Sequence, residues 1–105
     1  MLNVTFTEND KKLSLRLEGH AEYAEHGKDI VCASATILAY TLASIIDSFD
    51  DDVEAFINLA SGDTTIGCKC KDEKTYAKIA DAFRYTQTGY ALLEHNYPQY
   101  VKLML

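Results

Sequence analysis

The chain has 105 residues, of which 48% are hydrophobic and 25% are charged, and its formal net charge is −6. This length fits one domain, and the composition is typical of a globular protein. The negative charge argues against a nucleic-acid partner, because binding to phosphates depends on clustered lysine and arginine. We therefore expect a single domain over residues 1–105 that does not bind nucleic acid.

Two short stretches near the N-terminus alternate apolar and polar residues, as half-buried strands do. The polar segment TENDKK lies between them and is typical of a turn. The pattern predicts a β-hairpin. Its apolar positions are Leu2, Val4, Phe6, Leu13, Leu15 and Leu17.

Residues 19–28, GHAEYAEHGK, show no clean period and are mostly polar. A loop of this length in a compact domain often carries function. The segment is therefore the first place to search for a site.

A long apolar segment follows, and Asp29 is placed to cap a helix that runs from Ile30 to about Phe49. Acidic residues flank the apolar run, and Lys or Arg anchors are missing at both ends, so a buried core helix is a better interpretation than a membrane span. The expected inward positions are Ile30, Ile37, Leu38, Leu42, Ile45, Ile46 and Phe49.

The second half of the chain predicts two more strands, at residues 53–60 and 65–70, joined by the turn SGDT. Asp72 then caps a helix over residues 73–96, and residues 100–105 offer a last edge strand. The expected fold class is α+β, a small two-layer domain in the order ββαββα(β). It has two helices on a mixed or antiparallel sheet of about four strands.

Cys32 is the third residue of the first predicted helix. Unpaired N–H groups and the positive end of the helix dipole favour an anion there, and this setting lowers the pKa of a cysteine thiol. Cysteine is also among the most buried residue types, so packing in the core is an alternative that position alone leaves open.

A nucleophilic thiol needs a base, and the chain has three histidines. His20 ends the second predicted strand, at the opposite end of the loop from Cys32, and His26 lies inside that loop. The spacing favours His20 over His26 as the base. His95 falls in the last turn of the second helix, where interaction with the final carbonyls is the more common role.

The other two cysteines, Cys68 and Cys70, would point to the same face of a strand. No second pair completes a zinc site, and the spacing is not that of a redox C-x-x-C motif. We expect two inward-facing small hydrophobes and neither a metal nor a cofactor. A thiol-redox role that also uses Cys32 is a weaker alternative.

An odd number of cysteines points to reduced thiols, not to a disulfide framework. The segment MLNVTFTEND also lacks the basic and apolar regions of a signal peptide. We expect a cytoplasmic protein with no membrane partner.

Residues 18–38, EGHAEYAEHGKDIVCASATIL, resemble the ribosomal-processing cysteine protease (Prp) family of bacteria. The resemblance rests on G-H-A at residues 19–21, on G-x-D-I-V-C-A at residues 27–33 and on the length of the loop between them. Chain length and the expected order of elements also agree with that family.

This resemblance implies a single peptidase-like domain that acts as a homodimer. Its substrate would be the N-terminal peptide of large-subunit ribosomal protein twenty-seven, from which a short extension is removed. Cys32 would be the nucleophile, His20 the general base, and Asp29 the helix cap that helps to orient them. The implied mobile substrate loop consists of Ala21, Glu22, Tyr23, Ala24, Glu25, His26, Gly27 and Lys28.

One position departs from the family pattern, because Thr36 stands where the family usually has serine. The hydroxyl is kept and a methyl is added beside the expected site. A second function class is also compatible with the sequence: a ribosome-associated module that binds the same peptide without cutting it.

Overall fold

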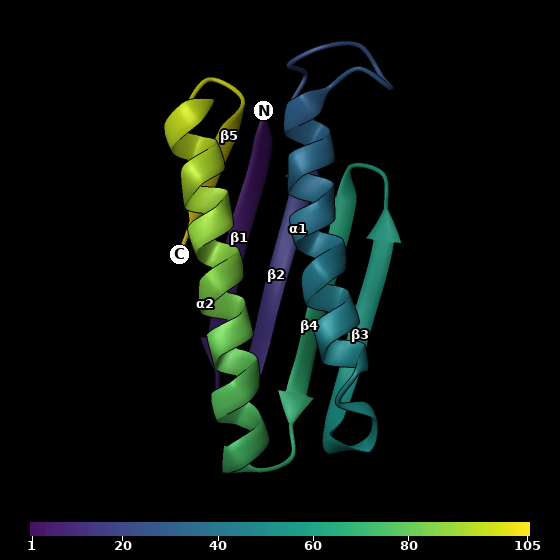
Figure 1. Cartoon of the computed structure of the whole chain (residues 1–105), viewed down its shortest axis with the longest axis vertical. Helices are drawn as coiled ribbons and strands as arrows, with labels where there is room; N and C mark the ends of the chain where they lie inside the picture. The colour runs from purple at the N-terminus through teal and green to yellow at the C-terminus, as the bar shows by residue number, and fades with distance from the viewer.

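A computed structural model describes residues 1–105 as two layers, a five-stranded sheet and two long helices that cover one of its faces (Figure 1). A short 3-10 turn, Asp50–Asp52, links the first helix to the third strand. The other elements are β1 Leu2–Asn9, β2 Lys12–Gly19, α1 Ile30–Asp47, β3 Val53–Ala60, β4 Asp63–Cys70, α2 Glu73–Asn96 and β5 Val101–Met104.

The strands lie in the order β3-β4-β2-β1-β5, so the sheet is mixed. The β1–β2, β2–β4 and β3–β4 pairs are antiparallel, and β5 runs parallel to β1, with Leu2 opposite Val101. The predicted α+β class and element order are confirmed. The expected count of about four strands is corrected to five, because the C-terminal residues pair with β1.

The helices pack on the apolar face of the β1–β2 hairpin, and all six of its predicted apolar residues are buried. Tyr90 on α2 is fully buried between the layers. Its hydroxyl donates to the carbonyl of Ala35 on α1 at 2.7 Å, and its ring meets that of Phe6 at 5.9 Å between centroids. Burial raises the pKa of Tyr90, so its hydroxyl stays protonated and keeps donating. One side chain therefore joins both helices to the sheet.

The predicted N-cap of α1 is confirmed, because the Asp29 side chain accepts from the backbone of Cys32. The helix ends at Asp47, two residues before the approximate end predicted near Phe49. The predicted inward stripe is also partly wrong: Ile30 and Ile37 are 54% and 62% exposed. Small residues face inward instead and let the helix lie close to its neighbours. The buried positions are Val31, Ala35, Ala39, Leu42, Ala43 and Ile46.

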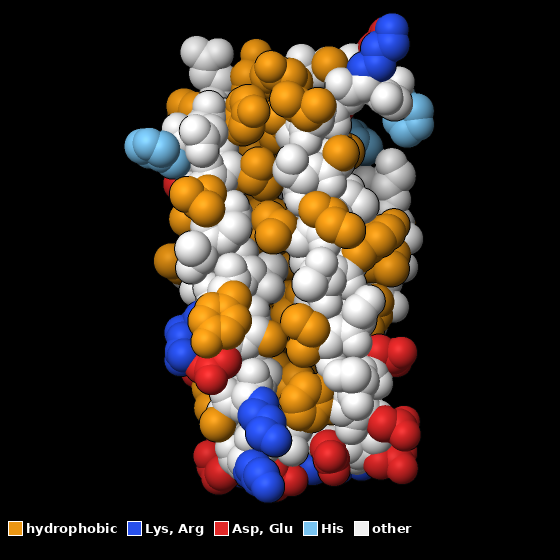
Figure 2. Space-filling model, viewed as in Figure 1, with side chains coloured by type: hydrophobic (Ala, Val, Ile, Leu, Met, Phe, Trp, Pro, Cys, Tyr) orange, Lys and Arg blue, Asp and Glu red, His pale blue; other side chains and the backbone are white.

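By length and composition alone α1 could cross a membrane. It lies on the sheet beside α2, however, and its buried side chains belong to the core cluster of the domain (Figure 1). Figure 2 shows apolar side chains gathered between the helices and along the outer side of α1 near β3. Most of the charged side chains on that face lie at the end opposite the loop that precedes α1.

Candidate functional site

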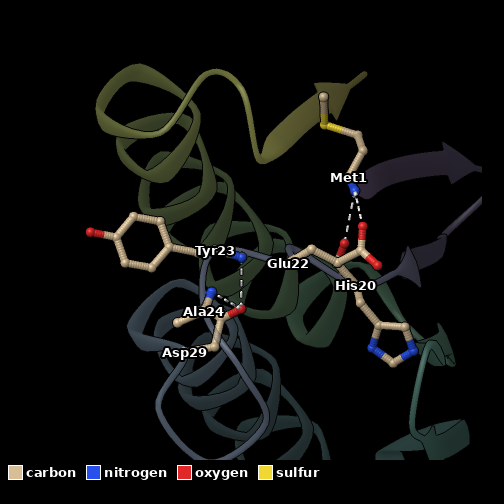
Figure 3. Close-up of polar contacts among 6 residues, drawn as sticks. All are labelled: Met1, His20, Glu22, Tyr23, Ala24 and Asp29. Atoms are coloured by element: carbon tan, nitrogen blue, oxygen red, sulfur yellow. Dashed lines mark hydrogen bonds and ion pairs between the residues drawn. The ribbon is translucent and has the colours of Figure 1, made fainter.

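The Asp29 carboxylate joins the loop to the start of α1. Its Oδ1 accepts from the amide of Cys32 at 2.8 Å. Its Oδ2 accepts from the amides of Tyr23 and Ala24 at 3.0 and 3.4 Å (Figure 3). Partial burial acts to raise the pKa of Asp29, but these backbone donors outweigh it and hold the pKa below its usual value. One ionised group thus orders both segments.

The Cys32 side chain is exposed at the N-terminal end of α1. It lies in the wall shared by two adjoining hollows, with volumes of about 330 and 680 Å³. Packing in the core is therefore the wrong interpretation of this cysteine. The residues that line both hollows are His20, Ala21, His26, Cys32, Thr36 and Tyr40.

His20 is held at the end of β2 by the turn between β3 and β4. The amide of Gly19 donates to the carbonyl of Gly62 in that turn at 2.9 Å. Gly62 has φ +76°, and a Cβ there would lie 2.8 Å from Nε2 of His20. A side chain at this position would require the exposed imidazole of His20 to shift, and the positive φ itself favours glycine. The sequence analysis did not predict a role for Gly62. The only sequence feature that pointed to it was its place in the turn SGDT.

The structure brings His20, His26 and Cys32 to the same hollow, as the loop predicts. No hydrogen bond joins either histidine to the thiol. His95 lines a different hollow with Met1 and Pro98. The spatial grouping therefore agrees with the predicted site, and the choice of His20 as base stays a prediction.

The loop itself is exposed from Glu22 to Lys28, whereas Ala21 is buried. Glu22 has φ +58° and Gly27 has φ +87°, so the chain turns sharply at both places. Before the loop, the α-ammonium of Met1 donates to the carbonyl of His20 at 2.8 Å (Figure 3). Because Ala21 is buried, it anchors the start of the loop. The mobility expected for residues 21–28 stays a prediction.

The hydroxyl of Thr36 and the backbone amide of Cys32 both already make hydrogen bonds. The Thr36 hydroxyl donates to the carbonyl of Cys32 at 2.8 Å, so the family's serine-to-threonine change keeps a hydroxyl that bonds to the helix. The amide of Cys32 is occupied by Asp29. This amide is therefore not free to donate to an oxyanion.

Cys68 and Cys70 are buried on β4, as predicted. Burial raises the pKa of Cys68 to about 12 and also raises that of Cys70. Figure 1 shows that β4 ends at the opposite end of the molecule from the start of α1, so these thiols do not join Cys32. The structure holds no group of three or more His, Cys, Asp or Glu side chains that could bind a metal ion.

The family model for cysteine protease Prp matches residues 1–102. A small α+β domain with an exposed thiol at the start of a helix is consistent with a thiol hydrolase. The family match identifies this hydrolase as a cysteine protease. The chain belongs to the Prp cysteine protease family and is a cysteine-type peptidase that acts on peptides. No curated protein is similar enough in sequence to match.

Solved structures share the fold. The essential ribosomal processing protease Prp from S. aureus, in complex with a covalently linked product peptide, is 23% identical with a TM-score of 0.81, covering 99% of this chain and 98% of that one. The same protease with a substrate peptide is 22% identical with a TM-score of 0.74, and each chain is covered completely. SMU.848 from Streptococcus mutans is 28% identical with a TM-score of 0.74, covering 100% of this chain and 94% of that one.

Removing the Asp29 carboxylate should loosen the loop and the helix together. We expect Asp29→Ala to lower the free energy of unfolding by about 1 kcal/mol at neutral pH, as loss of an N-cap does. Because the folded-state pKa is lowered, this stabilisation is present above the unfolded-state pKa of about 4 and is lost as pH falls through the folded-state value. Urea unfolding at pH 7 and pH 3 measures the difference, which should shrink at the lower pH.

Asp72→Ala is the matched control, because Asp72 caps α2 through the amide of Thr75 and touches no loop amide. Both variants should lose stability, but only Asp29→Ala should speed hydrogen exchange at Tyr23 and Ala24. Equal exchange at these amides in the two variants would contradict the role given to Asp29.

Gly62→Ala should displace the His20 ring. A comparison with Gly27→Ala isolates this effect, because Gly27 also has positive φ but a Cβ there meets no atom within 4 Å. Both variants should lose about 1 kcal/mol of stability from backbone strain. NMR of the imidazole groups should show the His20 resonances shifted in Gly62→Ala and unchanged in Gly27→Ala, and identical spectra would refute the contact.

Proposed function

We propose that this chain is an endopeptidase that removes a short N-terminal extension from large-subunit ribosomal protein twenty-seven. The observation that carries the catalytic part is the exposed thiol of Cys32, which shares a hollow with His20 at the start of α1. The choice of substrate rests on the motif resemblance, and the S. aureus protein described as a ribosomal processing protease supports it. Such a substrate is made and assembled in the cytoplasm, where cell fractionation should find the enzyme.

In the proposed reaction His20 takes the proton of Cys32, and the thiolate attacks the scissile carbonyl carbon. The thiol stands at the N-terminal end of α1, where the helix dipole is positive. The intermediate then collapses, His20 gives its proton to the leaving amine, and water hydrolyses the thioester. Since the amide of Cys32 already donates to Asp29, the oxyanion has to be met by other donors.

The side chains of His20 and Cys32 have to come together before the dyad can act, because no hydrogen bond joins them in the structure. Catalytic hydrogen bonds are often long or absent without substrate and tighten in the complex. Both side chains are exposed and face the same hollow, so side-chain rotation is open to them. We propose that the bound peptide completes the pair.

The walls of the hollow indicate how a peptide would lie. Apolar side chains from α1 and β3 border it, among them Tyr40 and Leu59, so apolar substrate residues fit beside the scissile bond. On the loop, Glu22 lines the larger hollow and Glu25 lies three residues further on, so a basic stretch of the substrate fits near the loop. The Met1 ammonium lies 4.0 Å from the Glu22 carboxylate and reduces its charge. Lys28 pairs with Glu25 at 2.9 Å and reduces the charge of that side chain.

Cleavage of a peptide that spans the extension tests the proposal. We expect Cys32→Ala to abolish cleavage and His20→Ala to reduce it at least about a thousandfold, since the nucleophile and its base act together. His26→Ala is the matched control in the same hollow and should retain most of the activity. Mass spectrometry of the products measures both rate and cleavage position, and full activity in Cys32→Ala would refute the mechanism.

The sequence also left open a second function, a ribosome-associated module that binds the peptide without cutting it, and the match to the cysteine protease family argues against it. Thiol reactivity separates the two. An activated Cys32 reacts with iodoacetamide at neutral pH faster than a free thiol, and His20→Ala slows it. A rate equal to that of a free thiol in the wild type, with peptide binding intact, would favour the binding module.

We also propose that the chain acts as a homodimer, as the family resemblance implies. On the edge strand β3 the side chain of Ile57 is 38% exposed, lines neither hollow and offers an apolar surface for a second copy. Sedimentation velocity should show a dimer for the wild type and a monomer for Ile57→Lys. Tyr85→Lys changes an exposed side chain on α2 and should leave the dimer intact.

A further inference from the structure

Tyr23 connects the loop to the turn between α2 and β5, which lies at the same end of the molecule (Figure 1). Its side chain projects away from that of His20 (Figure 3) and meets two other tyrosines edge to face. The ring centroids lie 5.4 Å from Tyr97 with an interplanar angle of 76°, and 5.2 Å from Tyr100 with an angle of 81°. These are the geometries that aromatic pairs prefer. The Tyr23 hydroxyl makes no hydrogen bond, so the contact depends on the ring.

The two partner tyrosines belong to a turn that is fixed at both ends. The amide of Tyr97 donates to the carbonyl of Leu93 on α2 at 2.8 Å, and the amide of Tyr100 donates to the carbonyl of Tyr97 at 3.0 Å. The amide of Leu2 on β1 donates to the carbonyl of Tyr100 at 2.8 Å. The turn between α2 and β5 is therefore a rigid platform, and the ring of Tyr23 rests on it.

The backbone of the same residue holds the site. The amide of Tyr23 donates to Asp29, which also caps the helix turn that carries Cys32. The neighbouring residues Glu22, Ala24 and His26 line the larger hollow beside the thiol. Tyr23 therefore holds this wall of the larger hollow in two ways. Its ring packs on the α2–β5 turn, and its amide donates to Asp29.

We propose that Tyr23 is a positioning residue, whose ring clasps the loop to the α2–β5 turn and keeps the hollow beside Cys32 ready for a peptide. The proposal rests on the proposed peptidase function for its substrate. From Glu22 to Lys28 the loop is exposed, and Tyr23 is the only aromatic residue in it. Without the ring the loop leaves the platform for part of the time, and the fraction of molecules able to bind peptide falls.

This model makes a specific kinetic prediction. When only a fraction of the enzyme can bind, the apparent dissociation constant rises by the inverse of that fraction, whereas saturating peptide restores the ordered loop. Tyr23→Ala should therefore raise KM roughly tenfold, because the loss of two aromatic contacts destabilises the ordered loop on that scale. The kcat of this variant should stay within about twofold of the wild-type value. A variant that merely misfolds loses active enzyme, which lowers kcat and leaves KM unchanged.

Steady-state cleavage of the extension peptide by full-length variants tests this split. Tyr23→Phe keeps the ring and should match the wild type, and Tyr85→Ala removes an equally large exposed tyrosine from α2 and should also match it. A KM for Tyr23→Ala within twofold of the wild type would overturn the proposal. So would a tenfold rise in KM for Tyr23→Phe, because the hydroxyl would then carry the effect.

A double-variant cycle with Tyr100→Ala locates the contact. If the two rings act through each other, the double variant should raise KM no more than about twofold above the larger of the single changes. Multiplicative effects of the two substitutions would show independent roles and would overturn the clasp.

Hydrogen exchange at residues 21–24 gives a readout that does not depend on catalysis. Exchange at these amides should speed about tenfold in Tyr23→Ala and stay at the wild-type rate in Tyr23→Phe and Tyr85→Ala. If the wild type fails to cut the peptide while this pattern holds, the proposed function fails and the clasp stands. If the wild type cuts it and exchange is unchanged in Tyr23→Ala, the clasp fails and the function stands.

Discussion

The Asp29 carboxylate is the interaction on which the arrangement of the site depends. It accepts backbone hydrogen bonds from both directions along the chain, from Tyr23 and Ala24 in the loop before it and from Cys32 in the helix after it. Because these donors hold its pKa low, the group is ionised at neutral pH and its bonds are charge-assisted. A single ion therefore caps the helix, shapes the loop and fixes the position of the thiol. The hydrogen bond from the amide of Cys32 to Asp29 also means that this amide is not available to stabilise an oxyanion.

Packing explains why an exposed thiol can be held at a defined place. The inward side of α1 carries small residues such as Ala35 and Ala39, so the helix lies close to its neighbours while its first turn extends to the rim of the sheet. Tyr90 then joins α1, α2 and the sheet through one hydrogen bond and one ring contact. At that rim the end of β2, the β3–β4 turn and the start of α1 converge. The thiol of Cys32 is therefore carried by the first turn of a helix that is packed in the core, whereas the loop beside it is exposed from Glu22 to Lys28.

The outer surfaces show how one helix serves two purposes. Not all apolar residues of α1 are buried: Ile37 and Tyr40 are exposed and line the larger hollow together with Cys32. The helix therefore supplies core on one side and an apolar border for the hollow on the other. Most of the charged residues on the face that carries the helices lie at the opposite end (Figure 2). On this face the charged side chains are thus concentrated at the end away from the hollow beside Cys32.

The sequence by itself determined what depends on neighbours along the chain. Alternation predicted the β1–β2 hairpin and its six buried residues, and the cap at Asp29 followed from side-chain chemistry. The loop predicted that His20 and Cys32 lie near each other, and the structure places both in one hollow. Only the tertiary structure decided which side of α1 faces inward, because an almost uniformly apolar run gives no phase, and the fit against α2 selects the small residues. It also decided that β5 completes the sheet, that Gly62 makes room for His20, and that Tyr23 meets Tyr97 and Tyr100. These contacts join residues far apart in the chain, and no local pattern encodes a contact that forms only once the sheet has brought both partners to one end.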